Sequence, residues 1–488
     1  MKRAIRWYDY ITINIYWFAI TTRAQVLTPL IIPLLVQQFV GEEAKGTYVG
    51  TMRLWALMVA VLVQAFMGLL SDHSTLRWGR RRPFIVIGTL GELAMFASFG
   101  FASSLEGMTG YWVLFALYIL SMVSSNTSHA ATQGLIPDLV PEDQRGRFSG
   151  VKALLELPAP LIFISLVVGR LVSAGHLWGG LLALIAVSVV CMFVALFVPE
   201  QPLQNAPFAL DWKPFVRLIL MTGAFTLIIL SIGAVVDTFM GLSLDLPPRI
   251  ALALTALVGL MAIGFAIMLG VGASMRISMG HDGSEHRSFT WWVINRLVFL
   301  VAANSMSGFM LYFLQERFAD LQGEKAASPA ATAMMFVGIL ILLTALPSGW
   351  LADHFGKKPI VALSGALATI GMFVVMLVPD LIAVYVGGSL IGAAVGLFYP
   401  ANWALGTTVV PQDQAGRYLG LSNLAGAGAG AIGAYIGGPI ADHMSYVLLF
   451  AIYGTLFLLS TLALKGVEEK DIQSVKGEGV QSWGGTPE

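Results

Sequence analysis

The chain has 488 residues, of which 57% are hydrophobic and 11% are charged, and its mean hydropathy is +0.78. A soluble domain carries about 25% charged residues, so this composition excludes a cytosolic enzyme, a secreted disulfide scaffold and a disordered protein. The 28 basic residues balance the 28 acidic ones, so we expect no nucleic-acid partner. The single cysteine, Cys191, excludes a disulfide framework and a cysteine-based metal site.

Long apolar stretches follow one another along the chain. A transmembrane helix needs about 20 mainly apolar residues, and the sequence holds fourteen such stretches. They run over residues 10–36, 49–71, 83–103, 110–136, 151–173, 177–198, 214–240, 249–275, 289–315, 330–352, 358–378, 381–409, 417–441 and 445–465. The sequence therefore predicts an all-α integral membrane protein with fourteen transmembrane helices.

Basic residues set the predicted orientation, because short cytoplasmic loops carry the excess of Lys and Arg. Most loop arginines fall on the side that also holds the N-terminus. The opposite side has little beyond Lys45, Arg53, Arg249, Arg317 and Lys325. We therefore expect cytoplasmic N- and C-termini and a location in the plasma (inner) membrane. The first stretch is too long for a signal peptide and lacks a cleavage site, so it is interpreted as a retained anchor.

An internal repeat divides the chain into two parts. PEDQRGRFSG at 141–150 matches PQDQAGRYLG at 411–420 at six of ten positions, and GLLSDH at 68–73 matches GWLADH at 349–354. The repeat predicts two six-helix bundles in parallel order with two inserted central helices. The expected domains are an N-terminal bundle (1–200), a cytoplasmic linker (201–213), the inserted helices (214–276), a cytoplasmic loop (277–288), a C-terminal bundle (289–465) and a disordered cytoplasmic tail (466–488).

These motifs resemble those of the major facilitator superfamily. Residues Gly349 to Ile360 fit its loop pattern Gly-x-Leu-Ala-Asp-x-x-Gly-basic-basic-x-Ile, whereas the first copy has an insertion between Asp72 and Gly79. That longer form, with LIPDLVPEDQRGR at 135–147, is similar to the branch of sucrose:proton and glycoside:cation symporters. The resemblance implies alternating access with substrate bound between the halves near the midplane. It also implies a small polar solute, such as a sugar, and a coupling proton or cation.

Charged loop residues form a predicted conformational latch. Asp72 ends a helix and is expected to face a cluster of arginines, and carboxylate–guanidinium pairs are strong. The predicted latch residues are Asp72, Arg80, Arg81, Arg82, Arg145, Arg147, Asp353, Lys357, Lys358 and Arg417. Either these charges hold the cytoplasmic face shut in one conformation, or they only fix the topology.

Ionisable residues inside the spans are functional candidates, because a charge at mid-membrane costs at least about 2.5–3.5 kcal/mol. Arg23 and Glu92 have similar depths, so they form either a buried ion pair or, if unpaired, a site where Glu92 carries protons. Glu156 either couples protons or pairs with Lys152, four residues earlier. His129 either titrates during transport, bonds a sugar hydroxyl, or is a satisfied interhelical histidine.

The second half contributes amide and aromatic groups instead. Arg296 either contacts substrate or snorkels to the headgroups. The complete set of substrate and coupling candidates is Arg23, Gln25, Glu92, Asn126, His129, Gln133, Glu156, Asn295, Arg296, Asn304, Tyr399, Asn402 and Trp403.

The expected function is a proton- or cation-coupled carrier. Alternatives are an efflux carrier for drugs or metabolites and a non-transporting facilitator-like assembly factor. No P-loop, zinc spacing, nucleophile elbow or haem motif appears, so we expect no enzyme, cofactor or metal. The expected partners are a small-molecule substrate, the coupling ion and the lipid bilayer, and the protein is expected to be a monomer.

Overall fold

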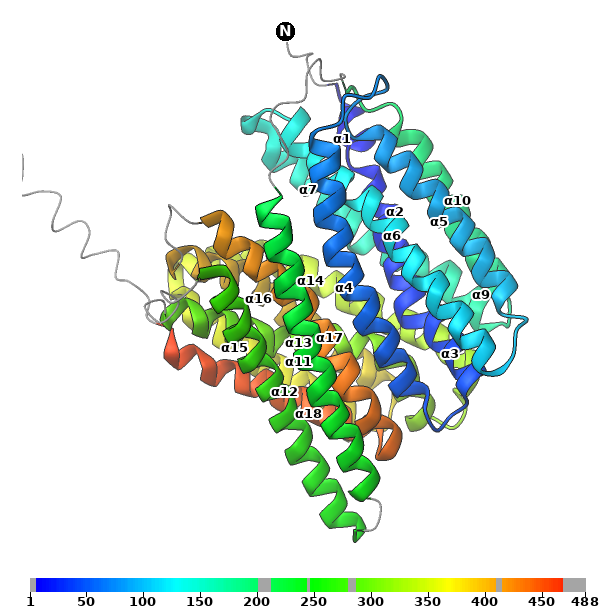
Figure 1. The fold of residues 1–488 in the computed structure, drawn as a ribbon, viewed down its shortest axis with the longest axis vertical. Coiled ribbons are helices and arrows are strands. Elements are labelled where there is room, and N and C mark those ends of the chain that lie inside the picture. Colours follow the sequence, from blue (N-terminus) through cyan, green and yellow to red (C-terminus); the bar gives the residue numbers. More distant parts are fainter. Residues whose placement is uncertain (1–5, 201–211, 244–245, 280–286, 410–414, 468–488) are drawn as a thin grey trace, which may run out of the picture.

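Helices account for the regular structure of the chain. The computed structural model describes residues 6–200, 212–243, 246–279, 287–409 and 415–467, with the backbone alone for 415–425, and these residues contain no strand. Thirteen helices are long and apolar enough to cross a membrane. In lipid, a helix satisfies its backbone polar groups internally, so the apolar stretches of the sequence adopt this form (Figure 1). The prediction of an all-α membrane protein is confirmed.

The N-terminal half has six spans. The first joins α1 (Asp9–Thr12), α2 (Ile15–Val26), a π-helical turn (Leu27–Ile31) and α3 (Ile32–Val40). Three single helices follow, α4 (Lys45–Asp72), α5 (Arg82–Ala102) and α6 (Gly107–Leu139). The fifth span joins α7 (Arg145–Glu156), α8 (Pro158–Phe163), a π-helical turn (Ile164–Val168) and α9 (Gly169–Ser173), and α10 (Leu177–Ala195) is the sixth.

Two long helices precede the C-terminal half. They are α11 (Lys213–Ser243) and α12 (Pro248–Met279). The second half consists of α13 (Arg287–Arg317), α14 (Ala327–Phe355), α15 (Lys357–Leu377), α16 (Leu381–Val409), α17 (Ala415–His443) and α18 (Tyr446–Ala463). With α17, which occupies the place of the predicted 417–441 span, the helices match all fourteen predicted stretches.

Proline interrupts the fifth span. Helix α7 ends at Glu156 and α8 begins at Pro158, because a proline has no backbone N–H to donate and clashes with the preceding turn. Cys191 is buried as a free thiol in a small apolar core that also contains Phe148 of α7.

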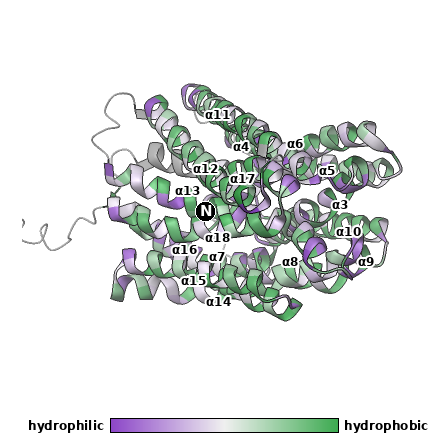
Figure 2. Ribbon diagram, turned by 90° about the horizontal axis from the view of Figure 1, so that it is seen from below, coloured by the Kyte–Doolittle hydropathy of each residue, from purple (hydrophilic) through white to green (hydrophobic). Residues whose placement is uncertain are grey.

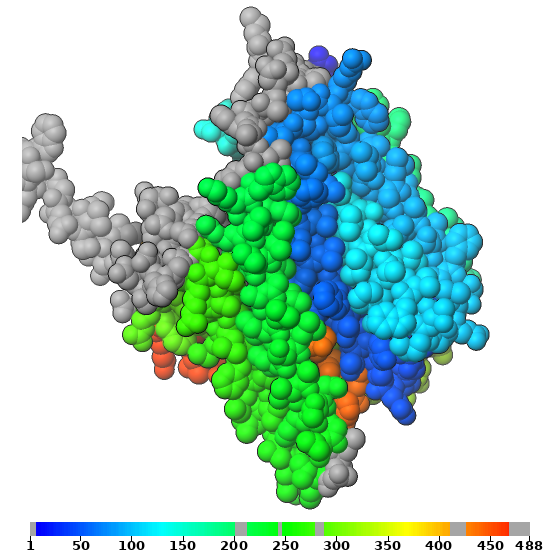
Figure 3. Space-filling model, viewed as in Figure 1, coloured from blue at the N-terminus to red at the C-terminus, as the bar shows by residue number. Residues whose placement is uncertain are grey.

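The two halves pack together through small residues of α4 and α17. A Cβ added at Gly50 would lie 3.0 Å from the carbonyl carbon of Ala434, and one added at Gly46 would lie 2.9 Å from the carbonyl oxygen of Gly438. Such close approach of backbones is typical of helix packing in membranes. The inserted helices α11 and α12 also contact α17, and Figure 3 shows them in green alongside the blue α4.

The contact between the halves is concentrated at one side of the membrane domain. We call the side of Trp7 the N-terminal side and the side of Lys45 the far side. Hydrogen bonds join the halves at the far side, where Gly46 and Thr47 donate backbone N–H groups to the Asp442 carboxylate at 2.8 and 2.7 Å. Apolar residues cover most of the length of the helices between the two sides (Figure 2).

Candidate functional site

A buried ion pair lies inside the N-terminal half. Nε of Arg23 on α2 donates to Oε1 of Glu92 on α5 at 2.8 Å, and both side chains are more than nine-tenths buried. Ser121 on α6 completes the group, because it accepts from Nη2 of Arg23 at 2.7 Å and donates to Glu92 at 2.7 Å. Of the two interpretations of these residues, the structure shows the paired arrangement.

A second polar group joins α2, α6 and α7. Nζ of Lys152 lies 3.3 Å from Oε2 of Glu156 and 3.7 Å from the centre of the Trp17 ring. His129 also contacts Trp17. The two rings meet edge-on, and their centroids are 5.4 Å apart. Gln133 approaches His129 Nε2 at 3.3 Å. The expected i,i+4 pair of Lys152 and Glu156 is therefore present, and Glu156 is about one-third exposed. His129 and Gln133 lie on the same face of α6.

The second half contains an amide network around Arg296. Its Nη1 donates to Oδ1 of Asn402 at 3.0 Å, and Nδ2 of Asn402 donates to Oδ1 of Asn295 at 2.8 Å. Nδ2 of Asn295 then donates to the backbone oxygen of Ser460 at 2.8 Å. The network therefore connects α13, α16 and α18 through groups that are at least nine-tenths buried.

Aromatic rings surround the Arg296 guanidinium. Its central carbon lies 5.9 Å from the ring centre of Trp292 and 5.8 Å from those of Tyr399 and Trp403. Arg296 is 8% exposed, whereas Tyr399 and Trp403 are 40% and 41% exposed. The Arg296 side chain is therefore enclosed by the aromatic group and by Asn402.

Three further candidates occupy different environments. Asn126 is buried on α6 and donates to the carbonyl of Met122 at 2.9 Å, within its own helix. Gln25 is half-buried on α2. Asn304 lies on α13 and donates to the carbonyl of Gly426 at 3.3 Å. The structure does not bring these three residues into the groups around His129 or Arg296.

Arg53, which the sequence predicts on the side opposite the N-terminus, is buried within α4. It is 6% exposed on α4. Its Nη2 donates across the contact surface between the two halves, which we call the seam, to the carbonyl of Asn304 on α13 at 3.1 Å. A Cβ at Gly308 would collide with the guanidinium, so glycine makes room for it. Its position four residues inside the 49–71 stretch was the signal that could have revealed it.

The charged loop cluster lies within one half. Arg81 is buried and forms an ion pair with Asp72, another with Asp138 at 2.9 Å, and a hydrogen bond to Ser71 at 2.5 Å. Arg80 pairs with Asp72 at 2.8 Å. These bonds join α4, α5 and α6, so they stabilise the N-terminal bundle and do not link the two halves in this conformation.

Other predicted latch residues have different partners. Arg145 pairs with Glu142 at 3.5 Å and bonds the carbonyls of Val140 and Pro137, so the expectation that it faces Asp72 is wrong. Arg82 donates to the carbonyl of Trp78 at 3.4 Å, and Arg147 is exposed.

Glu200 caps the same cluster. Its carboxylate accepts the backbone N–H groups of Arg81 and Arg82 at 2.6 and 3.1 Å. Burial raises the pKa of the Glu200 carboxyl, and the two donated hydrogen bonds oppose this rise.

The equivalent motif of the second half has no such cluster among the described residues. Asp353 and Lys357 form no ion pair there, and Lys358 donates to the carbonyl of Val467. The side chain of Arg417 lies outside the described residues.

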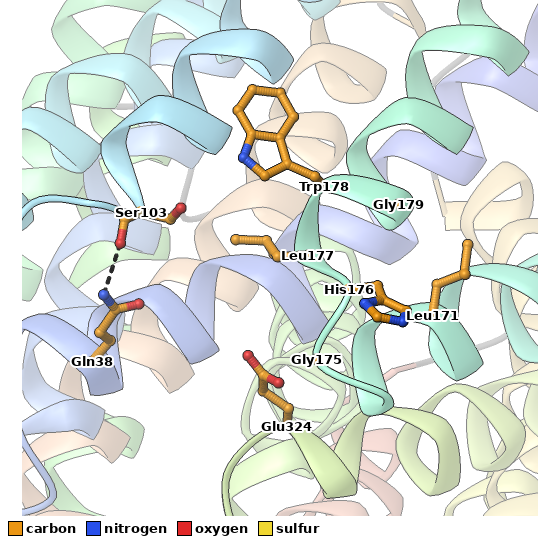
Figure 4. Close-up of a pocket in the computed structure, with 9 residues that line it drawn as sticks. All are labelled: Gln38, Ser103, Leu171, Gly175, His176, Leu177, Trp178, Gly179 and Glu324. Atoms are coloured by element: carbon orange, nitrogen blue, oxygen red, sulfur yellow. Dashed lines mark hydrogen bonds between the residues drawn. The ribbon is translucent and has the colours of Figure 1, made fainter.

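A pocket of about 630 Å³ opens at the far side, next to the seam (Figure 4). Gln38 from the first span and Glu324 from the second half line it, together with His176 and Trp178 at the start of α10. It contains none of the predicted site residues. Nearby, Ser173 donates to the carbonyl of Lys325 at 3.1 Å, so this pocket belongs to the far-side contact between the halves.

These features define a class of protein. Thirteen described helices that could span a membrane, with polar groups buried among them, are the features of a multi-pass membrane transporter. The sequence matches the Major Facilitator Superfamily over residues 11–315 and 294–484, and the chain belongs to this family. It is therefore a transporter of the facilitator type and not an enzyme.

Two relatives of this chain are named for the transport of different compounds. A multi-drug resistance efflux pump of Streptococcus pneumoniae, PmrA, is 30% identical over 165 residues, which are 33% of this chain and 41% of the pump. A lactose permease of Lactobacillus helveticus is 26% identical over 191 residues, which cover 34% of this chain and 28% of the permease. The chain matches less than half the length of either relative.

Solved structures share the fold over nearly the whole chain. The nucleoside transporter NupG superposes with a TM-score of 0.63 at 12% identity, over 94% of this chain and 99% of its own. A peptide transporter, POT, superposes with a TM-score of 0.65 at 15% identity, over 93% of each chain. At these identities the likeness extends to the fold alone.

Proposed function

We propose that this protein is a secondary active carrier that moves a small polar solute, such as a sugar or glycoside, by alternating access between two six-helix bundles. Its membrane is the plasma (inner) membrane, and both termini are cytoplasmic. The hydrogen bonds that join the halves at the far side support a conformation that is closed on that side. The proposed domains are those of the repeat, with α11 and α12 inserted between the bundles.

The amide network around Arg296 is the observation that carries this proposal. Asn295 and Asn402 are buried and bonded to each other, and Asn402 holds the Arg296 guanidinium, which Tyr399 and Trp403 flank with partly exposed rings. Sites for polar solutes combine an apolar or aromatic wall with a few well-placed polar groups. A polyhydroxylated ring fits this combination, because its faces stack on aromatic rings while its hydroxyls exchange hydrogen bonds.

Glu156 and His129 are the proposed coupling residues. Glu156 is partly exposed and pairs with Lys152, so protonation of the carboxylate would release the lysine. Glu92, in contrast, is buried against Arg23, where protonation would leave an unpaired buried charge. This difference supports Glu156 as the proton carrier and a structural role for Glu92.

An efflux carrier is the second candidate. The similarity to the PmrA efflux pump favours it. Cationic drugs need a carboxylate free to receive them, but Glu92 and Glu156 both have basic partners. The buried polar groups of the second half consequently favour a neutral or anionic solute.

Proteoliposomes test the proposed function directly. We expect lactose or methyl β-glucoside to enter vesicles that contain the protein and to acidify a lumen loaded with a pH-sensitive dye. Trp403→Ala should lower the uptake at least tenfold, whereas Trp112→Ala, which removes an exposed tryptophan at the far-side end of α6, should not. If no sugar moves and ethidium is expelled, the efflux alternative is correct; if nothing moves, the assembly-factor alternative gains support.

A further inference from the structure

Basic side chains inside the spans outnumber their acidic partners. Among the residues whose burial the structure describes, four buried basic residues other than Arg81 occur on the spans, namely Arg23, Lys45, Arg53 and Arg296. Arg23 pairs with Glu92, and Lys45 pairs with Glu42 at 2.6 Å. Among the described residues, Arg53 and Arg296 have no carboxylate within ion-pair distance. Two guanidinium charges are therefore held at membrane depth without counter-ions.

The free edge of Arg296 distinguishes it from Arg23. Carboxylates bind a guanidinium through two parallel N–H groups, and in Arg23 the Nε and Nη2 edge is filled by Glu92 and Ser121. Within the described part of the chain, the Arg296 guanidinium donates only through Nη1, to Asn402, and its Nε is buried without a hydrogen-bond partner. The edge that binds a carboxylate in the first half is thus unoccupied in the second half.

Aromatic contacts orient the Arg296 charge but do not neutralise it. A cation–π contact contributes about 0.5–2 kcal/mol, while a centrally placed arginine costs at least about 2.5–3.5 kcal/mol in the membrane. Tyr399 and Trp403 combine contact with Arg296 and about 40% exposure. They therefore lie between the buried guanidinium and the accessible surface of the helices.

Arg53 adds a second positive charge at the seam. Its Nη2 is bonded to the Asn304 carbonyl, and its Nη1 has no hydrogen-bond partner. Asn304 lies on α13, eight residues or about 12 Å along the helix from Arg296. Both arginines therefore raise the electrostatic potential along the same stretch of α13, which attracts anions.

We propose that the transported solute is an organic anion whose carboxylate binds the Nε and Nη2 edge of Arg296 between Tyr399 and Trp403. This inference rests on the proposed carrier function and narrows its substrate class to carboxylates, of which a sugar acid is the form that also stacks on the rings of Tyr399 and Trp403. Arg53 raises the electrostatic potential near the site and does not contact the carboxylate. Binding neutralises the Arg296 charge at the moment when the site closes.

Matched pairs of probes test the inference on the purified full-length protein. The pairs are methyl β-glucuronide with methyl β-glucoside, N-acetylglycine with N-acetylglycinamide, and benzoate with benzyl alcohol. Each pair differs chiefly in the carboxylate. We expect the carboxylate of at least one pair to raise the thermal unfolding temperature and to bind at least tenfold more tightly than its neutral partner.

Single substitutions test whether Arg296 is the residue that causes the preference for carboxylates. Arg296→Gln should abolish it, while Arg170→Gln, which removes an exposed arginine on α9, should retain it. If Arg296→Gln does not fold, Arg296→Lys decides, since a lysine keeps the charge but lacks the planar edge and should weaken carboxylate binding at least tenfold. Equal binding of all pairs, or an unchanged preference in both variants at Arg296, would overturn the inference.

The outcomes separate this inference from the proposed function. Binding and transport of methyl β-glucoside without any preference for its acid would overturn the carboxylate site and leave the sugar carrier standing. A preference confined to benzoate or N-acetylglycine would support the carboxylate site and refute a sugar as cargo.

Discussion

Arg23 and Glu92 lie 69 residues apart in the chain and meet at 2.8 Å inside the N-terminal half. Their side chains come from the first and third spans, so the pair fixes the relative depth of α2 and α5. A second oxygen of Glu92, Oε2, has no hydrogen-bond partner. The pair therefore stabilises the half mainly through the single charged contact and the Ser121 hydroxyl.

Removal of the Glu92 charge should destabilise the protein. Glu92→Gln leaves Arg23 buried and unpaired, which costs about 3–5 kcal/mol, and we expect a lower thermal unfolding temperature in detergent. Ser98→Ala on the same helix, whose exposed hydroxyl bonds only its own backbone, should change little. An unchanged unfolding temperature combined with lost proton uptake would identify Glu92 as the proton carrier instead.

A side chain at Gly50 should open the far side. Gly50→Leu places its Cβ against the Ala434 backbone, so we expect α4 and α17 to separate and the outward-open state to gain population. The measurement is labelling by a small polar thiol reagent of Ser165→Cys in a Cys191→Ser background, because Ser165 is buried at the seam and contacts Thr332 at 3.0 Å.

The control for this prediction lies on the same helix. A Cβ at Gly68 would meet no atom within 4 Å, so Gly68→Leu should leave labelling of the reporter cysteine near the parent level. Labelling that rises equally in both variants would show that a larger side chain anywhere on α4 has the effect, contrary to the proposed seam.

Loss of Arg81 should weaken the N-terminal half without shifting the two halves. Arg81→Gln removes contacts to Asp72, Asp138 and Ser71. We expect a loss of about 2–3 kcal/mol, in the range of charged hydrogen bonds, and a lower unfolding temperature, with Arg147→Gln as the exposed control. A change in labelling of the reporter cysteine would instead reveal a latch between the halves.

Neutralisation of Glu156 should separate coupling from transport. Glu156→Gln mimics the protonated carboxyl and leaves Lys152 against Trp17, so we expect exchange of labelled solute across vesicles to persist. Accumulation driven by a proton gradient should fall at least tenfold. Retained accumulation in Glu156→Gln, measured beside Lys213→Gln as a control at the start of α11, would exclude Glu156 as the proton carrier.

The sequence by itself determined the helical architecture. Span length and apolar content follow from the thickness of the bilayer, so the helix boundaries agree with the predicted ones to within a few residues at most ends. The breaks at Pro158 and the repeat of loop motifs are equally local, and they identify the fifth span and the family without any tertiary information.

Only the tertiary structure decided which charges meet. Depth along a helix predicted that Arg23 could reach Glu92, but not that Arg53 crosses to Asn304 or that Arg145 turns away from Asp72. These outcomes depend on the rotation of each helix about its axis, which packing against neighbours sets. A span that is apolar on every side gives little signal of that rotation, and so the unoccupied edge of Arg296 became visible only once α13, α16 and α18 were packed together.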